Sequence, residues 1–177
     1  PALAETPILD QGRIKPMDTF ARSWLEVYSG RDHLGDQTAL GWLLDVLFKP
    51  DIAVKQPIFK ISHPAVRDML DLPSRKGGRY TFEEVYPSLQ KQKQYWDVFR
   101  DVPQDRLTMP QRQLLEIVDH IESFFDLMTT FEYTRPQITI ESPALAQKLG
   151  LPAMTPISPM EMQKHHKKLE AAFNALS

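Results

Sequence analysis

The sequence predicts a mainly α, irregular helical domain with one or two short β-strands. Three observations support this fold class. Apolar residues recur at helical spacing in several segments, most clearly between Thr108 and Phe131. Most of the other predicted helices are short and bounded by proline or glycine. Only two short segments, Ile58–Ser62 and "RPQITI", have the bulky composition that is typical of strands.

The composition is that of a soluble globular protein. The chain has 177 residues, of which 42% are hydrophobic and 25% charged, so it suits one domain, or one plus a tail, with a sizeable core. The formal charge of -2 gives no reason to expect nucleic acid as a partner. The absence of cysteine excludes disulfides, thiolate zinc sites, cysteine nucleophiles and covalent haem attachment through thioethers.

The N-terminal part is predicted to form two helices after an irregular stretch over residues 1–12. Pro16 has a fixed backbone angle that suits the first turn of a helix, and Gly30 is a typical stop. Asp36 is a good N-cap for a second helix, which ends near Phe48 where a Lys-Pro pair follows. Apolar residues go most of the way round this second helix, so we expect it to be buried.

The middle of the chain alternates short elements and turns. We interpret Ile58–Ser62 as a strand, followed by a short helix that stops at Pro73. After a cationic turn with two adjacent glycines, Thr81 and Glu84 have the spacing of a capping box and open another helix. Pro87 lies in its second turn and predicts a kink or a restart there.

The strongest helix prediction runs from Thr108, paired with Gln111 as a capping box, to about Phe131, and this helix should be the spine of the domain. After it, "RPQITI" is a candidate strand that could pair with Ile58–Ser62 in a small sheet. We therefore divide the chain into a helical core, residues 1–135, and a proline-spaced connector with a C-terminal helix, residues 136–177, either packed on the core or leading away from it.

Two further helices are expected in the C-terminal part. Pro143 and Gly150 bracket a short one, and "SPME" opens a last one that reaches the C-terminus.

Signatures of enzymes are missing, and we assign no catalytic residue and no metal site. The sequence has no phosphate-binding glycine pattern, no Gly-x-Ser-x-Gly and no His-Glu-x-x-His. His165 and His166 are adjacent on a helix and point in different directions. His33 and His63 lie next to turn residues and are expected to be capping or surface groups, while His120 lies between Asp119 and Ile121 on the long helix. A lone histidine can also serve as an axial ligand of haem.

The stretch "DQGRIKPMDTFAR" carries the candidate partner-facing residues. Arg13 and Lys15 precede a helix start, where an exposed cation opposes the helix dipole by about 0.3–1 kcal/mol. Asp18 suits the first turn, and Arg22 is four residues further on and can pair with it. Arg13 and Lys15 either pair with a carboxylate such as Asp10 or present their charges to an anionic partner.

A second cationic segment, "SRKGGR", lies between Ser74 and Arg79. It could meet phosphate or lipid headgroups, and the alternative is that these side chains are simply solvated.

Several segments together resemble a known family. They are "GRIKPMDTFAR", "ALGWLLDVLFKP", "PIFKISHPAVRDMLDLP" and "GRYTFEEVYPSLQKQ". The chain up to about Phe131 is similar to the extracytoplasmic region of large membrane proteins of c-type cytochrome biogenesis, of the system II haem lyase type (CcsA/ResC-like). The positions that match the family's first motif are Gly12, Arg13, Lys15, Pro16, Asp18, Thr19, Ala21 and Arg22. The tryptophan-rich haem signature of the family is absent, so no haem-binding residue is carried over.

The resemblance implies a non-catalytic periplasmic domain, excised from a membrane protein of cytochrome c assembly in the inner membrane. Such a domain would dock apocytochrome c, a partner subunit or the membrane portion of the same protein. The fragment itself would carry no cofactor, and haem would belong to the parent protein.

Two other interpretations stay open. The domain could bind haem directly through one or two of His33, His63 and His120 in an aromatic pocket, or it could be a helical adaptor unrelated to haem. A hydrolase is a more distant alternative, because no constellation of nucleophile and base is found.

Overall fold

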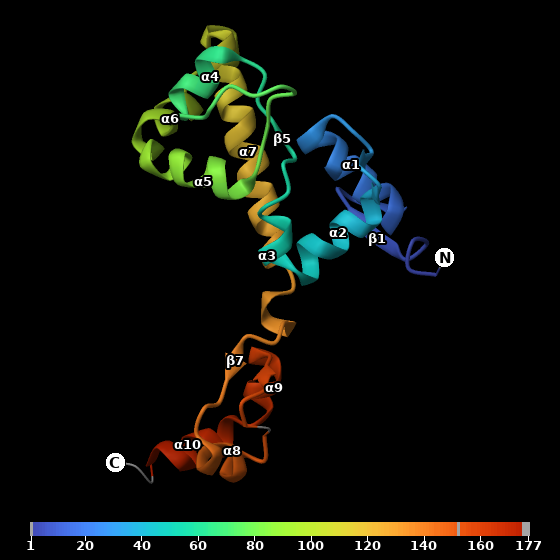
Figure 1. The fold of residues 1–177 in the computed structure, drawn as a ribbon, viewed down its shortest axis with the longest axis vertical. Helices are drawn as coiled ribbons and strands as arrows, with labels where there is room; N and C mark the ends of the chain where they lie inside the picture. The colour runs from blue at the N-terminus through green and yellow to red at the C-terminus, as the bar shows by residue number, and fades with distance from the viewer. Residues whose placement is uncertain (1, 152, 175–177) are drawn as a thin grey trace. The chain divides into compact units, whose positions relative to one another are not determined.

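The computed structural model describes residues 2–151 and 153–174, in two compact units, Pro1–Met128 and Thr129–Ser177 (Figure 1). The mainly α prediction is confirmed, because in the described chain helices dominate and every sheet has only two short strands. The first unit holds helices α1 (Met17–Ser29), α2 (Ala39–Phe48), α3 (Pro50–Ala53), α4 (Pro64–Met69), α5 (Phe82–Lys91), α6 (Lys93–Arg100) and α7 (Met109–Thr129), the last of which ends one residue beyond the unit boundary.

Three antiparallel strand pairs complete this unit. They are formed by β1 (Pro7–Asp10) with β2 (Arg13–Pro16), β3 (His33–Leu34) with β4 (Gln37–Thr38), and β5 (Phe59–Lys60) with β6 (Arg79–Tyr80). The second unit contains β7 (Ile138–Thr139) paired with β8 (Pro156–Ile157), and helices α8 (Pro143–Leu149), α9 (Pro159–Lys164) and α10 (His166–Asn174).

An aromatic cluster forms the centre of the first unit. The ring of Phe59 lies 5.3 Å from that of Phe124 and 5.6 Å from that of Tyr28. Phe82 joins the cluster at 5.4 Å from Phe124, and Trp42 at 6.0 Å from Tyr28. These five residues come from α1, α2, β5, α5 and α7, so burial of their rings holds most of the elements of the unit together. The long helix α7 contributes a whole stripe to this core, as its apolar spacing predicted.

The structure corrects two predictions in the N-terminal part. Within the stretch that was expected to be irregular, Pro7–Asp10 form the strand β1, which is paired with β2. The second helix begins at Ala39 instead of after Asp36, since residues 33–38 form a hairpin and Thr38 takes the capping role. The Thr38 hydroxyl accepts a hydrogen bond from Gly41 N–H at 3.1 Å.

Two more corrections concern the later elements. The strand at Phe59 pairs with β6, which follows it closely in sequence, and not with "RPQITI", whose Ile138 pairs with Ile157 instead. The last helix is divided at His165 into α9 and α10. The short helix between Pro143 and Gly150 and the capping box of Thr81 with Glu84 are confirmed.

Candidate functional site

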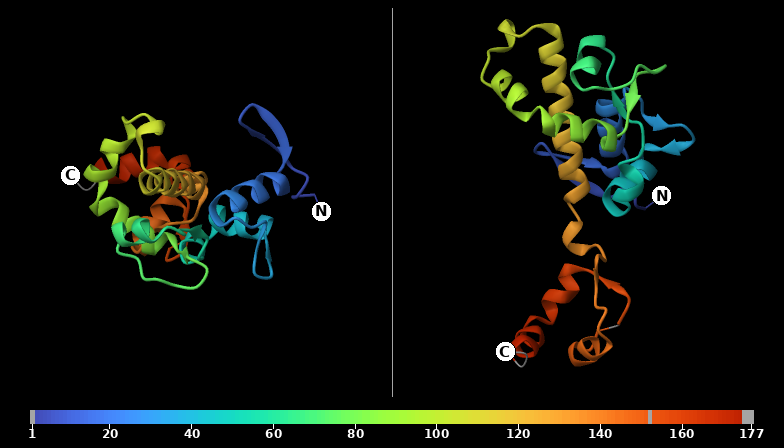
Figure 2. Two further views of the ribbon diagram at one scale, coloured as in Figure 1. Left: turned by 90° about the horizontal axis from the view of Figure 1, so that it is seen from above. Right: turned by 60° about the vertical axis from the view of Figure 1, so that its left-hand side comes forward.

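The candidate partner-facing residues lie on the β1–β2 hairpin and the first turns of α1. Gln11 and Gly12 form the two-residue turn, with φ of 49° and 77°. Positive φ at both positions is characteristic of the type I′ turns that join tightly paired strands. Figure 2 shows the hairpin extending away from α1.

Backbone hydrogen bonds hold the residues before the hairpin to the start of α1. Met17 N–H donates to Thr6 O at 2.9 Å, and Asp18 N–H donates to Ala4 O at 3.1 Å. The N-cap residue Pro16 has no side chain that could accept these bonds. Carbonyl groups from the segment before β1 therefore replace a side-chain cap, and they fix the hairpin relative to the helix.

Three of the four candidate residues form ion pairs within this segment. Lys15 Nζ lies 2.6 Å from the Asp10 carboxylate, and both side chains are largely covered. Arg22 Nε donates to Asp18 at 2.7 Å, as the i, i+4 spacing predicted. The hydrogen bond with Asp18 is the main cause that raises the pKa of Arg22.

Arg13 differs from these three residues. Its position is opposite Asp10 across the hairpin, but the Asp10 carboxylate pairs with Lys15. Among the described residues we find no ion pair that includes Arg13, and its side chain is exposed. The segment therefore holds one uncompensated positive charge next to its turn.

The hairpin also exposes an apolar pair that the sequence analysis missed. Leu9 and Ile14 are direct cross-strand partners, and 73% and 76% of their surfaces are exposed. Because side chains alternate along a strand, this pair lies on the opposite face from Arg13 and Lys15. The Gln-Gly dipeptide between two four-residue runs was the signal that could have revealed the hairpin.

The strand edges of this hairpin are poorly suited to pairing with another strand. Pro7 and Pro16 are register partners, and neither has a backbone N–H to donate. Proline at such positions blunts an edge against pairing. We therefore expect a partner to contact side chains of the hairpin rather than its backbone groups.

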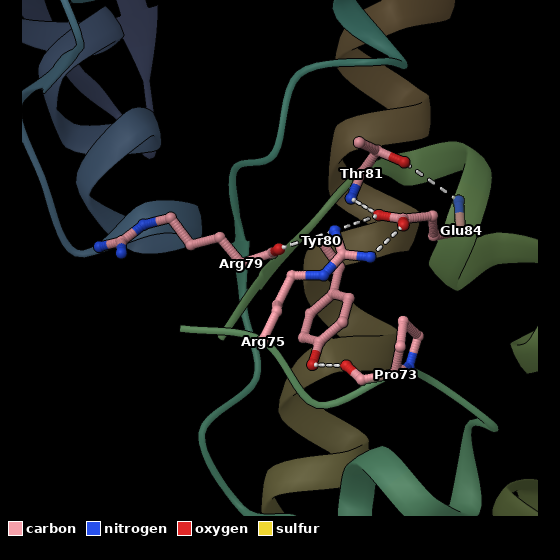
Figure 3. A network of polar contacts seen from close by, with 6 residues as sticks. All are labelled: Pro73, Arg75, Arg79, Tyr80, Thr81 and Glu84. Atoms are coloured by element: carbon pink, nitrogen blue, oxygen red, sulfur yellow. Dashed lines mark hydrogen bonds and ion pairs between the residues drawn. The ribbon is translucent and has the colours of Figure 1, made fainter. Parts of the chain in front are cut away.

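The second cationic segment is mostly engaged within the fold (Figure 3). Arg75 forms two hydrogen bonds with the Glu84 carboxylate, at 2.6 and 3.3 Å, and its guanidinium lies 4.7 Å from the ring of Tyr80. Glu84 also accepts from Thr81 N–H at 2.8 Å, which completes the capping box. Burial raises the pKa of Glu84, but the bonds from Arg75 and Thr81 outweigh it, so the pKa is lowered overall.

The three isolated histidines occupy different environments. His33 is exposed and pairs with Asp32 at 2.8 Å. His63 is the N-cap of α4, where Nδ1 accepts from Ala65 N–H at 3.2 Å, and it lines a pocket of about 440 Å³. His120 is half-buried on α7 and lines neighbouring pockets of about 230 and 200 Å³. His63 and His120 thus line different pockets, and direct haem binding stays a prediction.

The described residues contain no group of three or more histidine, aspartate or glutamate side chains arranged to hold a metal ion. No helix in the described part of the chain is long and apolar enough to cross a bilayer. No protein-family model matches the sequence, and no curated protein matches it with significance.

Proposed function

We propose that this chain is a non-catalytic docking domain of a periplasmic, membrane-bound cytochrome c assembly protein, and that the β1–β2 hairpin with the start of α1 is its contact surface for apocytochrome c or a partner subunit. The observation that carries the proposal is the uncompensated charge of Arg13 on a hairpin that is fixed to α1. The resemblance of "GRIKPMDTFAR" to the family motif supplies the biological context.

The geometry separates the roles of the two cations. Lys15 is paired and largely covered, so it stabilises the hairpin, whereas Arg13 is exposed and available to a partner. The exposed pair Leu9 and Ile14 adds apolar surface on the opposite face of the same hairpin, so a partner that contacts both must enclose the hairpin. Contacts that combine a few apolar anchors with a charge are typical of specific protein interfaces.

Charge reversal at the two positions tests the proposal. Arg13→Glu should lower the free energy of unfolding by less than Lys15→Glu, because it breaks no ion pair with a described residue, although the new carboxylate faces Asp10 across the hairpin. Lys15→Glu should be destabilising, because it removes an ion pair and places two carboxylates side by side. Both changes in stability can be measured by urea unfolding of the purified chain.

The effect on function is tested by introducing substitutions into the native gene. We expect Arg13→Glu to reduce the amount of mature c-type cytochrome, measured by haem staining, while Lys93→Glu does not. Lys93 begins α6, is exposed and forms no ion pair with another described residue, so it is a matched control. Normal maturation in Arg13→Glu and in Leu9→Ser/Ile14→Ser would contradict the docking role of the hairpin.

The alternative of direct haem binding is favoured by the position of His63 beside a pocket of about 440 Å³. Titration of the chain with haemin, followed by absorbance, tests it. A saturable Soret shift that is lost in His63→Ala or His120→Ala would support this second function, and a flat titration would exclude it.

A further inference from the structure

Three cations surround the C-terminal end of α1, and the docking proposal does not use them. Arg79 Nη2 donates to the carbonyl of Ser29, the last residue of α1, at 2.9 Å. Lys60 is the register partner of Arg79 in the β5–β6 pair. The Lys60 ammonium lies against Gly30, since a Cβ added to Gly30 would be 3.9 Å from Lys60 Nζ. Arg31 follows directly, and we call Arg31, Lys60 and Arg79 the cation cluster.

The charges of this cation cluster are not balanced by carboxylates. None of its three members forms an ion pair with another described residue. Glu26 and Glu116 line a pocket of about 200 Å³ together with Lys60, but neither is within ion-pair distance of it. The described surroundings therefore leave three positive charges close together.

Arg79 is the member with the least solvent around it. Its Nη1 donates weakly to Gly77 O at 3.4 Å, and its Nε is buried with no acceptor among the described residues. Burial, and then the charge of Arg31, lower the pKa of this guanidinium. A partly buried cation beside a like charge is unfavourable unless an anion compensates it.

The helix end accounts for only part of this charge. The C-terminus of an α-helix carries roughly half a negative elementary charge, and α1 has no basic residue of its own in its last turn. Lys60 and Arg79 can therefore serve partly as its counter-charges. Three full positive charges exceed this requirement, and none of them is paired with a carboxylate of the described residues, so the cation cluster can also accept an anionic ligand.

We propose that the cation cluster binds a phosphate group. Such a group carries one to two negative charges and two or three non-bridging acceptor oxygens in a compact volume, which fits three cations gathered round a single helix end. A carboxylate has two oxygens in one plane, whereas the oxygens of a phosphate group are arranged tetrahedrally and can accept from cations on several sides. The phosphate can come from a soluble phosphate compound or from the headgroup of an anionic lipid.

The site is partly pre-organised for such a ligand. Arg75 and Glu84 hold the loop that leads into β6, and Figure 3 shows the Arg79 side chain extending from this strand towards α1. Gly78 lets the loop approach the backbone just after β5 closely, because a Cβ there would lie 2.8 Å from Ile61 O. A fixed guanidinium binds an oxyanion with less loss of entropy than a mobile one.

Calorimetric titration of the whole chain with inorganic phosphate, at ionic strength held constant with sodium chloride, tests the proposal. We expect saturable binding that is weakened at least tenfold in the double variant Arg31→Gln/Lys60→Gln. The same variant should unfold like the unaltered chain, because both side chains are exposed. Arg79 is left unchanged, since its bond to Ser29 supports the end of α1. Lys93→Gln is the matched control and should bind phosphate normally.

A second arm identifies the source of the phosphate by co-sedimentation with vesicles of phosphatidylcholine, with and without phosphatidylglycerol. Binding to the anionic vesicles that is lost in the double variant indicates a lipid headgroup, whereas binding of inorganic phosphate alone indicates a soluble compound. The proposal is overturned if neither probe binds, or if the double variant binds as tightly as the unaltered chain. Binding of a polyglutamate peptide without any phosphate response also overturns it.

Discussion

His120 places an ionisable ring at the edge of the aromatic core. Its ring lies 5.7 Å from that of Tyr28, on the half-buried side of α7. Burial lowers the pKa of His120, and the nearby charges of Glu116 and Asp119 oppose this effect without cancelling it. The folded protein therefore favours the neutral ring.

The lowered pKa of His120 predicts a loss of stability in mild acid. The unfolded chain takes up the proton first, near pH 6.5, so stability is fully present above that pH and falls as the pH is lowered towards the folded pKa. His120→Gln should flatten the dependence of the unfolding free energy on pH below about 6.5, with each unit of pKa difference between the folded and unfolded states worth about 1.4 kcal/mol. Urea unfolding at a series of pH values measures it.

The exposed His33 offers the matched substitution for this experiment. His33→Gln should retain the pH dependence of the unaltered chain. If His120→Gln loses stability in acid as steeply as the unaltered chain does, other groups cause that loss.

Replacement of glycine at two positive-φ positions should lower the stability by different amounts. A Cβ at Gly12 would meet nothing within 4 Å, whereas a Cβ at Gly78 would lie 2.8 Å from Ile61 O. Gly12→Ala should lower the free energy of unfolding by about 1–2 kcal/mol, which is the cost of the left-handed conformation for a residue with a Cβ. Gly78→Ala should cost more, because the backbone of β5 or of the loop must also shift. Thermal unfolding of both variants compares them, and equal losses would argue against the close approach.

At the scale of the element, the capping box opens α5 and links it to the Arg75 loop. Thr81 accepts from Glu84 N–H at 3.2 Å, and Glu84 accepts in return from Thr81 N–H at 2.8 Å. The same Glu84 carboxylate receives Arg75. The start of α5 and the geometry of the cationic loop therefore depend on the same carboxylate.

Loss of the Thr81 cap should be measurable. Thr81→Ala is expected to lower the free energy of unfolding by about 1 kcal/mol, because one N–H of the first turn loses its acceptor. Thr19→Ala, at an exposed position within α1, is the control and should leave the stability equal or slightly higher. Denaturation by urea measures both, and similar values for the two variants would contradict the capping role.

At the scale of the molecule, the two units have separate hydrophobic cores. The larger core draws its buried residues from positions 21–124, and the smaller one consists of Ile140, Ala146, Leu149 and Ile157. The cores share no residue. The larger one contains the whole aromatic cluster, which is enough for an independently folded domain.

This division predicts that residues 1–129 fold on their own. The truncated chain keeps α7 complete and should show a cooperative thermal transition and dispersed amide resonances in nuclear magnetic resonance spectra. Within the full chain, Leu149→Ala should destabilise the second unit by about 2–5 kcal/mol, because a fully buried side chain is removed. A truncated chain without cooperative unfolding would show that the first core is incomplete.

The sequence by itself determined the local features of this protein. Helical spacing gave α1 and α7, the Thr-x-x-Glu pattern gave the start of α5, and the pair Asp18 with Arg22 followed from i, i+4 spacing. Each of these depends on residues within one or two helical turns of each other. Such features can be read from the chain because their partners are close in sequence.

Only the tertiary structure decided which distant residues meet. It paired Phe59 with Tyr80 instead of with the later strand, and it showed that Lys15 pairs with Asp10 while Arg13 has no ion-pair partner among the described residues. It also brought Lys60 and Arg79 to the end of α1. Strand pairing and the gathering of charges depend on loop closure and on burial of the whole core, which local spacing does not encode.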